Sequence, residues 1–276
     1  MKTVLVSDFT LEDEIAGGSE FVDDTVAKAM GVDIVRSKDF EPEKGQKLIL
    51  SNISTMRQET IDFIKDNCEY VILEHDYKIH ITRHPWRFEG NFVPKDQRVN
   101  YNLYKNAKAV FTQTDDHAEI FKLNEVEGNF ISLKCSIWSE EELKLLNKKR
   151  KSRAQKQYAV MQSDNPIKNT ALAEKLCKAN KWDYDLVPKM SHYDFICKLS
   201  DYSTLVFLPM ARETCCRLLV EARALGLNTI TSDNSGAFRS NWYSLSGGEL
   251  INFLRETSAK NMEMISKCLN DSPPTS

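Results

Sequence analysis

Two glutamates in the second half of the sequence, Glu213 and Glu221, have the residue type and the spacing to act together. Seven residues separate them, and eight steps of about 100° along a helix leave them on broadly related faces. Glu213 follows the apolar run 205–208 and a short loop, so we expect it before or at the first turn of a helix over 213–225. There it projects into the cleft at the carboxyl end of the strand, and backbone N–H groups of 214–216 face any anion that enters.

This segment resembles the donor-binding signature of retaining glycosyltransferases with the GT-B fold, especially the large family numbered four. The signature is a glutamate, seven residues and a second glutamate followed by alanine, which is Ala222 here. The helix of the signature ends in glycine, which is Gly226 here, before a strand and the loop Ser235-Gly236. The resemblance covers most of the chain and is strongest over 158–240. The chain is shorter than a typical member and is similar to compact, virus-encoded glycosyltransferases.

The resemblance implies roles for the residues of this segment. In the family, the first glutamate contacts the transferred sugar and the second holds the ribose of the nucleotide. Glu213 is therefore a candidate catalytic residue and Glu221 a candidate donor-binding residue. Carboxylates accept hydrogen bonds from paired hydroxyls and need no altered pKa to do so. The further donor-binding candidates of the segment are Thr214, Cys215, Cys216 and Arg217.

A lysine in the loop after the apolar run YAVM is the next part of the implied donor site. The family neutralises the pyrophosphate with an arginine and a lysine on its second domain, and Lys168 stands where the resemblance places the lysine. The arginine expected a few residues earlier is replaced near Ser163 or Asp164, so the mode of diphosphate binding departs from that of the family. Arg212 and Arg217 could compensate for this loss of positive charge.

A glycine pair, Gly17-Gly18, separates the strand expected at Thr3–Ser7 from a helix. Glycine lets the backbone approach a phosphate or a sugar closely, and a helix N-terminus adds partial positive charge. Alone, the pair indicates a turn. In the family, the corresponding loop lies over the diphosphate of the donor, so the resemblance makes both glycines donor-binding candidates. No G-x-G-x-x-G follows the strand, which disfavours a nicotinamide-dependent oxidoreductase.

The strand expected over 70–74 leads into His75 and Asp76, at the end where α/β sheets present catalytic residues. The family often has a histidine in this region that contacts the sugar near the reacting carbon. The resemblance therefore makes His75 the first catalytic candidate, with Asp76 second and His80 third. A histidine that caps or bridges at the end of a strand is the alternative.

The segment 78–95 is dense in basic and aromatic residues, and we expect acceptor specificity in the same half of the chain. Its acceptor-binding candidates are Arg83, Trp86 and Arg87. Such a segment can stack bases and hold phosphates, stack sugars, or form an ordinary exposed loop anchored by Trp86 and Phe88. The sequence leaves these three possibilities open.

No pattern in the sequence indicates a metal site. The seven cysteines include no C-x-x-C pair, and Asp115-Asp116-His117 fits a helix cap better than a ligand set. GT-B enzymes generally stabilise the leaving diphosphate with helix termini and basic side chains. The resemblance thus implies no essential metal and no cofactor, with a nucleoside diphosphate sugar as co-substrate.

The elements that position these residues form a regular alternation. Short apolar runs alternate with amphipathic stretches throughout, the pattern of parallel strands joined by crossover helices. We expect an α/β fold, and the resemblance specifies GT-B, with two Rossmann-like domains whose parallel sheets face an interdomain cleft. The expected parts are an acceptor-side domain over 1–138, a linker helix over 139–157 and a donor-binding domain over 158–276. The last helix could pack back on the first domain.

Composition excludes several classes of protein. A chain of 276 residues with 41% apolar and 28% charged residues can bury a real core, which excludes disorder and fibres. The 37 basic and 40 acidic residues balance to −3, so no overall field commits the molecule to nucleic acid or an anionic membrane. No apolar run approaches the ~18 residues of a membrane span and no signal-peptide core is present, so we expect a soluble, cytoplasmic protein.

The resemblance therefore implies a retaining hexosyl- or pentosyltransferase. Its donor is a nucleoside diphosphate sugar, and its acceptor is a glycan, a lipid-linked sugar or a modified nucleic-acid base. The alternative is a non-catalytic protein of the same fold that binds nucleotide-sugars or nucleic acid, which the missing arginine allows. The sequence does not indicate an oligomeric state.

Overall fold

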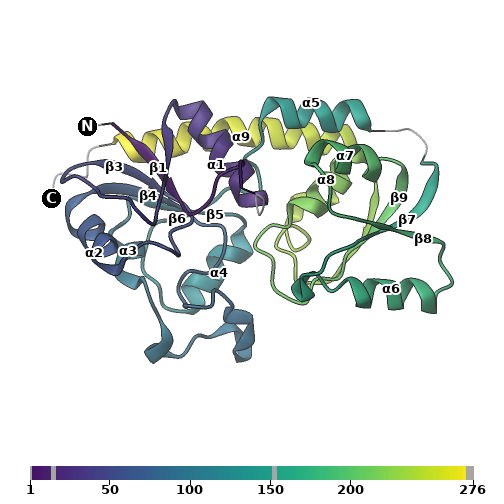
Figure 1. Cartoon of the computed structure of the whole chain (residues 1–276), viewed down its shortest axis with the longest axis horizontal. Helices are drawn as coiled ribbons and strands as arrows, with labels where there is room; N and C mark the ends of the chain where they lie inside the picture. Colours follow the sequence, from purple (N-terminus) through teal and green to yellow (C-terminus); the bar gives the residue numbers. More distant parts are fainter. Residues whose placement is uncertain (1, 14–16, 151–153, 272–276) are drawn as a thin grey trace. The chain divides into compact units, whose positions relative to one another are not determined.

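The computed structural model describes residues 2–13, 17–150 and 154–271 (Figure 1). The chain divides into a first unit, residues 1–138 with 257–276, and a second unit, residues 139–256. Ala16, beside the glycine pair, and residues 151–153 of the expected linker lie outside the described residues.

The first unit is built on a six-stranded parallel sheet with the order β2-β1-β3-β4-β5-β6. Its strands are β1 (Val4–Ser7), β2 (Asp33–Arg36), β3 (Lys47–Leu50), β4 (Glu69–Leu73), β5 (Ala109–Thr112) and β6 (Phe130–Ser132). The strand order reverses between β1 and β3. Open α/β sheets bind ligands in the crevice at the carboxyl ends of strands where such a reversal occurs.

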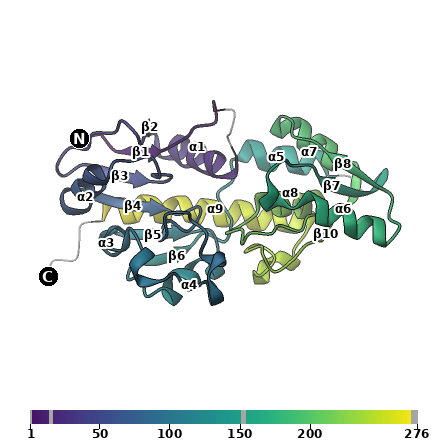
Figure 2. The same ribbon diagram turned by 60° about the horizontal axis from the view of Figure 1, so that its bottom comes forward.

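Helices cover both faces of this sheet (Figure 2). One face carries α1 (Gly18–Met30) and the last part of α9 (Gly247–Asn270), and the other carries α2 (Gln58–Asn67), α3 (Tyr101–Asn106) and α4 (Asp115–Leu123). Successive side chains of β1 alternate between the two cores, with Val4 and Val6 in one and Leu5 in the other. Burial on both faces explains why the strands form uninterrupted apolar runs in the sequence.

The second unit has a four-stranded parallel sheet with the order β10-β9-β7-β8. Its strands are β7 (Lys156–Met161), β8 (Tyr184–Val187), β9 (Tyr202–Val206) and β10 (Asn228–Ile230). Helix α6 (Thr170–Ala179) packs on one face around Val160 and Val206. Right-handed crossovers place α7 (His192–Leu199) and α8 (Arg217–Leu225) on the other face, where α5 (Glu140–Lys149) packs against both.

Side-chain caps set the starts of several helices. Ser139 and Glu142 form a capping box at the start of α5, and Thr114 accepts a hydrogen bond from the His117 amide at the start of α4. The short 3-10 turns are η1 (Pro85–Arg87), η2 (Glu89–Asn91), η3 (Lys95–Gln97), η4 (Pro166–Lys168) and η5 (Asn241–Ser244). No helix within the described ranges is long and apolar enough to cross a membrane.

The two parallel α/β sheets confirm the predicted fold class. The N-terminal stretch of the first unit ends at Trp138. Helix α5 belongs to the second unit, and residues 257–276 belong to the first unit. Within the first unit, Asn261 of α9 donates hydrogen bonds to the carbonyls of Leu133 and Ser136, both at 2.8 Å. The carbonyls that accept these hydrogen bonds belong to the backbone after β6, so the buried side-chain amide of Asn261 fixes α9 to the first sheet.

Candidate functional site

Lys168 and Glu213, which lie far apart in the sequence, meet at the carboxyl end of the second sheet. The ammonium of Lys168 donates a 2.7 Å hydrogen bond to Oε1 of Glu213. Lys168 ends η4, after β7, and Glu213 lies in the loop after β9. A backbone hydrogen bond of 2.8 Å from Met210 to Ile167 joins these two loops. The exposed fractions of the two side chains, 29% and 20%, leave the pair accessible to a ligand.

Lys168 keeps its positive charge in this position. Burial acts to lower the pKa of Lys168, but the adjacent carboxylate of Glu213 outweighs it, and the pKa lies above its ordinary value. The ammonium carries three N–H donors. It can therefore hold Glu213 with one donor and offer the others to the oxygens of a phosphate.

The structure corrects the predicted start of the next helix. We expected the helix to begin at Glu213, but α8 begins at Arg217. Glu213 instead forms an isolated parallel bridge with Ser235. In this bridge, the backbone amide of Glu213 donates a 2.7 Å hydrogen bond to the Asn234 carbonyl. The backbone then turns at Cys216, whose φ of 74° lies in the left-handed region.

This correction changes which amides begin the helix. Thr214, Cys215 and Cys216 precede α8, so the amides at the positive end of the helix are those of Arg217 and the next residue. The Cys216 thiol is buried, and burial raises its pKa. Cys216 is therefore a packed thiol and not a nucleophile.

The second glutamate, Glu221, lies one turn into α8 within a network of charged side chains. His192 at the start of α7 approaches Oε1 of Glu221 to 2.9 Å, and Nε of Arg217 lies 4.0 Å from the same oxygen. Arg217 also donates to Oε1 of Glu142 on α5. The other oxygen of Glu142 accepts from Ser139 in the capping box. One glutamate thus caps α5 and anchors Arg217.

The raised pKa of His192 predicts that the stability of the second unit depends on pH. Burial acts to lower the pKa of His192, but the hydrogen bond and the charge of Glu221 outweigh burial, and the pKa is raised above 6.5. Arg217 acts to lower this pKa and Glu142 to raise it. Protonated His192 stabilises the folded state through its contact with Glu221. This contribution to the free energy of unfolding is complete below pH 6.5 and is lost as the pH rises through the folded-state pKa of His192.

We expect His192→Gln to remove this dependence, because glutamine keeps a donor for Glu221 but does not titrate. The measurement is the midpoint of thermal unfolding from pH 5 to 9. His84→Gln in the first unit is the control and should keep the wild-type decline above pH 6.5, because burial lowers the pKa of His84. An identical decline in wild type and His192→Gln would contradict the assignment.

In the first unit, the glycine pair lies at the start of α1. Gly17 is the N-cap and Gly18 the first helical residue. The Gly17 amide donates to Oε2 of Glu20 at 2.7 Å, and the other oxygen of this carboxylate accepts from Ser19. Glu20 is buried, so negative charge already occupies the positive end of α1. A phosphate at this helix end would lie beside that carboxylate.

His75 lies at the carboxyl end of β4 and forms part of a buried hydrogen-bond network. Its Nε2 is 3.0 Å from Oδ1 of Asp23 on α1, and its Nδ1 is 3.3 Å from the side-chain amide nitrogen of Gln113. An amide nitrogen only donates, so Nδ1 accepts and Nε2 carries the proton that Asp23 accepts. Ser7 and Ser51, which end or follow β1 and β3, also donate to Asp23. The network therefore joins the carboxyl ends of four strands.

Asp76 belongs to a second buried cluster. The buried Lys78 ammonium contacts Oε1 of Glu74 and, at 3.3 Å, Oδ1 of Asp76, while Arg83 donates to Oδ2 of Asp76 at 2.9 Å. Burial acts to raise the pKa of Asp76, but Lys78 and Arg83 outweigh burial and lower it. Burial raises the pKa of Glu74 despite Lys78. With its pKa lowered, Asp76 is ionised at neutral pH and suits binding of hydroxyls better than proton donation.

Tyr104 completes the cluster by donating a 2.6 Å hydrogen bond to Oε2 of Glu74. We expect Tyr104→Phe to destabilise the protein by about 1–2 kcal/mol, because it leaves a buried carboxyl oxygen without its donor. The measurement is urea unfolding, with Tyr193→Phe as control, because Tyr193 is 54% exposed. Equal stability of the wild type and Tyr104→Phe would show that Glu74 does not depend on this hydroxyl.

Solved structures of glycosyltransferases resemble this chain over almost its full length. HepE from Anabaena, in complex with UDP and glucose, is 12% identical, with 98% of this chain and 92% of HepE covered and a TM-score of 0.52. A glycosyltransferase from Rickettsia africae is 12% identical, with 98% and 99% covered and a TM-score of 0.52. WaaG, a glycosyltransferase involved in lipopolysaccharide biosynthesis, is 12% identical, with 96% and 93% covered and a TM-score of 0.50.

The chain has the GT-B fold. At 12% sequence identity, the similarity of this chain to these three structures concerns the fold alone. No protein-family model matches the sequence, and no curated protein matches it. The GT-B fold supplies the two parallel sheets, and the side chains at their carboxyl ends supply the chemistry.

The basic and aromatic segment of this GT-B chain forms three consecutive 3-10 turns. Arg83 and Arg87 are exposed, and the Arg87 guanidinium lies 5.6 Å from the ring centre of Trp86. His80 is buried, and its ring accepts from Thr82 and packs against Phe88. His80, the third catalytic candidate, therefore holds the loop in place.

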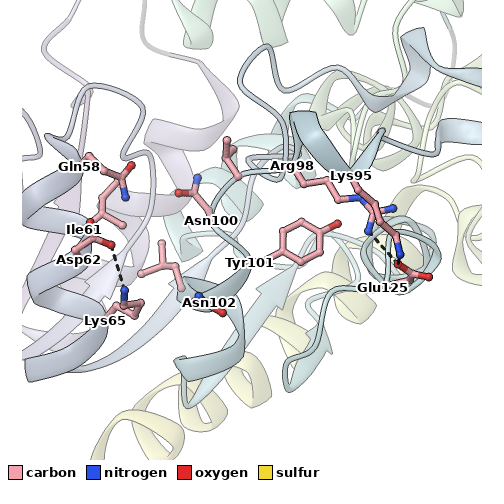
Figure 3. Close-up of a pocket in the computed structure, with 12 residues that line it drawn as sticks. Gln58, Ile61, Asp62, Lys65, Lys95, Arg98, Asn100, Tyr101, Asn102 and Glu125 are labelled. Atoms are coloured by element: carbon pink, nitrogen blue, oxygen red, sulfur yellow. Dashed lines mark hydrogen bonds and ion pairs between the residues drawn. The ribbon is translucent and has the colours of Figure 1, made fainter.

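A pocket of about 480 Å³ lies elsewhere in the first unit of the GT-B fold, between α2, α3 and the residues after η3 (Figure 3). The ring of Tyr101 and the side chains of Asn100 and Gln58 lie around it. Two ion pairs border it, Lys65 with Asp62 and Arg98 with Glu125. The lining includes none of the residues selected from the sequence.

No cluster of metal-binding side chains is found in the part of this GT-B chain that the structure describes. Among residues 2–13, 17–150 and 154–271, no group of three or more His, Cys, Asp or Glu side chains is placed to hold a metal ion. His117 is buried, and burial lowers its pKa to about 3. Its Nε2 donates to the Asp76 carbonyl and its Nδ1 accepts from the Gln113 amide. Independence from metal stays a prediction.

Proposed function

We propose that the protein is a retaining glycosyltransferase of the family 4 type, which transfers a hexose or pentose from a nucleoside diphosphate sugar. The observation that carries the proposal is the Lys168–Glu213 pair, which sets a cation and a carboxylate 2.7 Å apart at the carboxyl end of the second sheet of a GT-B fold. A diphosphate needs the cation, and a sugar hydroxyl needs the carboxylate.

The transfer breaks the bond between the anomeric carbon and an oxygen of the diphosphate. An acceptor oxygen takes its place on the same face, and the proton of the acceptor hydroxyl leaves with the diphosphate. Negative charge develops on the diphosphate as this bond breaks. Lys168 and the first amides of α8 are fixed positive groups that stabilise this charge. Glu213 accepts a hydrogen bond from a hydroxyl of the sugar and orients the anomeric carbon. The carboxylate of Glu221 accepts a hydrogen bond from a hydroxyl of the ribose.

Uridine diphosphate glucose is the first donor to test, because HepE holds UDP and glucose in its crystal structure. The acceptor is a glycan, a lipid-linked sugar or a modified nucleic-acid base, bound by the first unit near Arg83, Trp86 and Arg87. His75 and Asp76 are the proposed catalytic candidates of the first unit, with Gly17 and Gly18 close to the donor. The proposed reaction uses no metal and takes place in the cytoplasm.

The test is a screen of UDP-, GDP- and ADP-sugars, each with glycan, lipid-linked and DNA acceptors. Mass spectrometry records the free nucleoside diphosphate and the glycosylated product. The proposal expects turnover of one donor, with an anomeric configuration of the product equal to that of the donor by proton NMR. Binding of a nucleotide-sugar without any turnover would support the non-catalytic binding protein. Inversion of the configuration would contradict the retaining mechanism.

A further inference from the structure

We propose that His192 is a positioning residue for the nucleotide: it fixes the carboxylate of Glu221 so that one oxygen stays available to a ribose hydroxyl. The inference rests on the proposed function, which assigns Glu221 to the ribose. It adds a residue that neither the sequence pattern nor the resemblance indicates.

The two oxygens of the Glu221 carboxylate differ in their surroundings. Oε1 lies 2.9 Å from Nε2 of His192 and 4.0 Å from Nε of Arg217. Oε2 has no hydrogen-bond or ion-pair partner among the described residues. The side chain is 7% exposed, but Oε2 is not one of the fully buried atoms without a partner, so it retains contact with solvent. Oε2 is therefore the oxygen of Glu221 that is left for a ligand, while the protein holds the other.

The position of His192 is itself fixed by local structure. His192 is the first residue of α7, and Ser191 caps this helix by accepting a hydrogen bond from the Asp194 amide. Both α7 and α8 follow strands of the same sheet and lie on the same face of it. The imidazole thus approaches Glu221 from a neighbouring helix, and its 24% exposure keeps it at the edge of the site.

Arg217 does not replace His192 in this task. Its guanidinium is bound by Glu142, which is also the capping glutamate of α5, and its distance from Glu221 is too long for a hydrogen bond. Without a donor at Oε1, the terminal carboxylate can rotate about its last bond, a torsion with broad energy wells. Loss of His192 would then let Glu221 turn toward Arg217, and Oε2 would lose its fixed direction.

A ribose hydroxyl is the ligand group that this arrangement fits. A carboxylate oxygen is only an acceptor, so its ligand must donate, and a phosphate at neutral pH does not. A hydroxyl donates and carries no negative charge that would repel the carboxylate. Fixing the acceptor in advance lowers the entropy cost of binding.

The test is isothermal titration of the full chain with UDP, GDP and ADP, followed by the 2′,3′-dideoxy form of the nucleotide that binds best. For His192→Leu we expect about tenfold weaker binding of the nucleotide, the effect of one lost hydrogen bond. His192→Gln should restore most of the affinity, because it keeps a donor. With the dideoxy nucleotide, wild type and His192→Leu should bind equally, since no hydroxyl is left for Glu221 to accept from.

The possible failures of the two proposals are distinct. If the wild type binds none of the three nucleotides, the proposed function is contradicted, and this inference falls with it. If the wild type binds but His192→Leu has the same affinity, or loses it equally for the dideoxy form, only the positioning role is contradicted. His84→Leu, in the first unit, is the control for a histidine replacement. Circular dichroism of each variant confirms that it is folded.

Discussion

Replacing Glu213 with alanine should lower kcat for sugar transfer by about 10³-fold, in the range found when one fixed polar group at a reacting centre is removed. Glu213 is held in place by the 2.7 Å bond from Lys168 and by backbone bonds of its own residue to the loop after β10. It therefore needs no reorganisation when the sugar arrives. Alanine removes both the acceptor for the sugar hydroxyl and the group that fixes Lys168.

The measurement is steady-state release of the nucleoside diphosphate with the donor identified in the screen. Glu213→Gln keeps one acceptor oxygen and should be less impaired than Glu213→Ala. Glu249→Gln is the matched control, because Glu249 is exposed in the first turn of α9 of the second unit. A kcat of Glu213→Ala within a few-fold of the wild type would remove Glu213 from the reaction.

Lys168→Met should weaken the binding of the nucleoside diphosphate by about 10²-fold, the effect of losing charge-assisted hydrogen bonds. Methionine keeps an apolar side chain of similar length, but it removes the ammonium that lies over the ring of Phe207. The raised pKa of Lys168 predicts that the wild-type affinity does not fall between pH 7 and 9 through loss of this charge. The affinity should weaken with added salt, and less so in the variant.

Calorimetric titration of nucleoside monophosphate and diphosphate separates this effect from general damage. The loss in Lys168→Met should be larger for the diphosphate than for the monophosphate. Lys175→Met on α6 is the control, since Lys175 is exposed on the same unit. An equal loss for both nucleotides would mean that Lys168 contacts something other than the second phosphate.

The combined variant Lys168→Met/Glu213→Gln tests the pairing seen in the structure. Each single variant leaves one mostly buried charge without its partner, and the combined variant leaves neither. The losses in the midpoint of thermal unfolding should therefore be less than additive. Strict additivity would indicate that the two side chains do not interact in solution.

The sequence predicted the strands and most helices of the fold because local patterns determine them. The strands expected at Thr3–Ser7 and over 70–74 are β1 (Val4–Ser7) and β4 (Glu69–Leu73), each within one residue of the predicted bounds. Each is a short apolar run or an amphipathic segment between clear boundary residues. The capping box of Ser139 and Glu142, a serine three residues before a glutamate, is also a local signal.

The start of α8 could not be predicted in this way. The helical pattern extends back to Glu213, but the bridge of Glu213 with Ser235 is a contact between distant segments. That bridge keeps the residues before Cys216 extended, and the left-handed turn at Cys216 delays the helix to Arg217. Tertiary pairing here overrides local propensity.

The sequence indicated the residues of the candidate site one by one, but it did not indicate which of them contact one another. Lys168 and Glu213 were selected individually from the resemblance, and their contact depends on two loops of one sheet. His192 and Asp23 lie on α7 and α1, and no spacing connects them with Glu221 or His75. Side chains that position other side chains carry no local signal, because their partners lie on different elements.

The most direct test of the account is a crystal structure of the full chain with the donor identified in the screen. We predict that the sugar hydroxyls lie within about 3 Å of Glu213, a ribose hydroxyl within the same distance of Oε2 of Glu221, and the diphosphate beside Lys168. Density for the nucleotide in the pocket between α2 and α3, or away from the carboxyl end of the second sheet, would contradict the central claim.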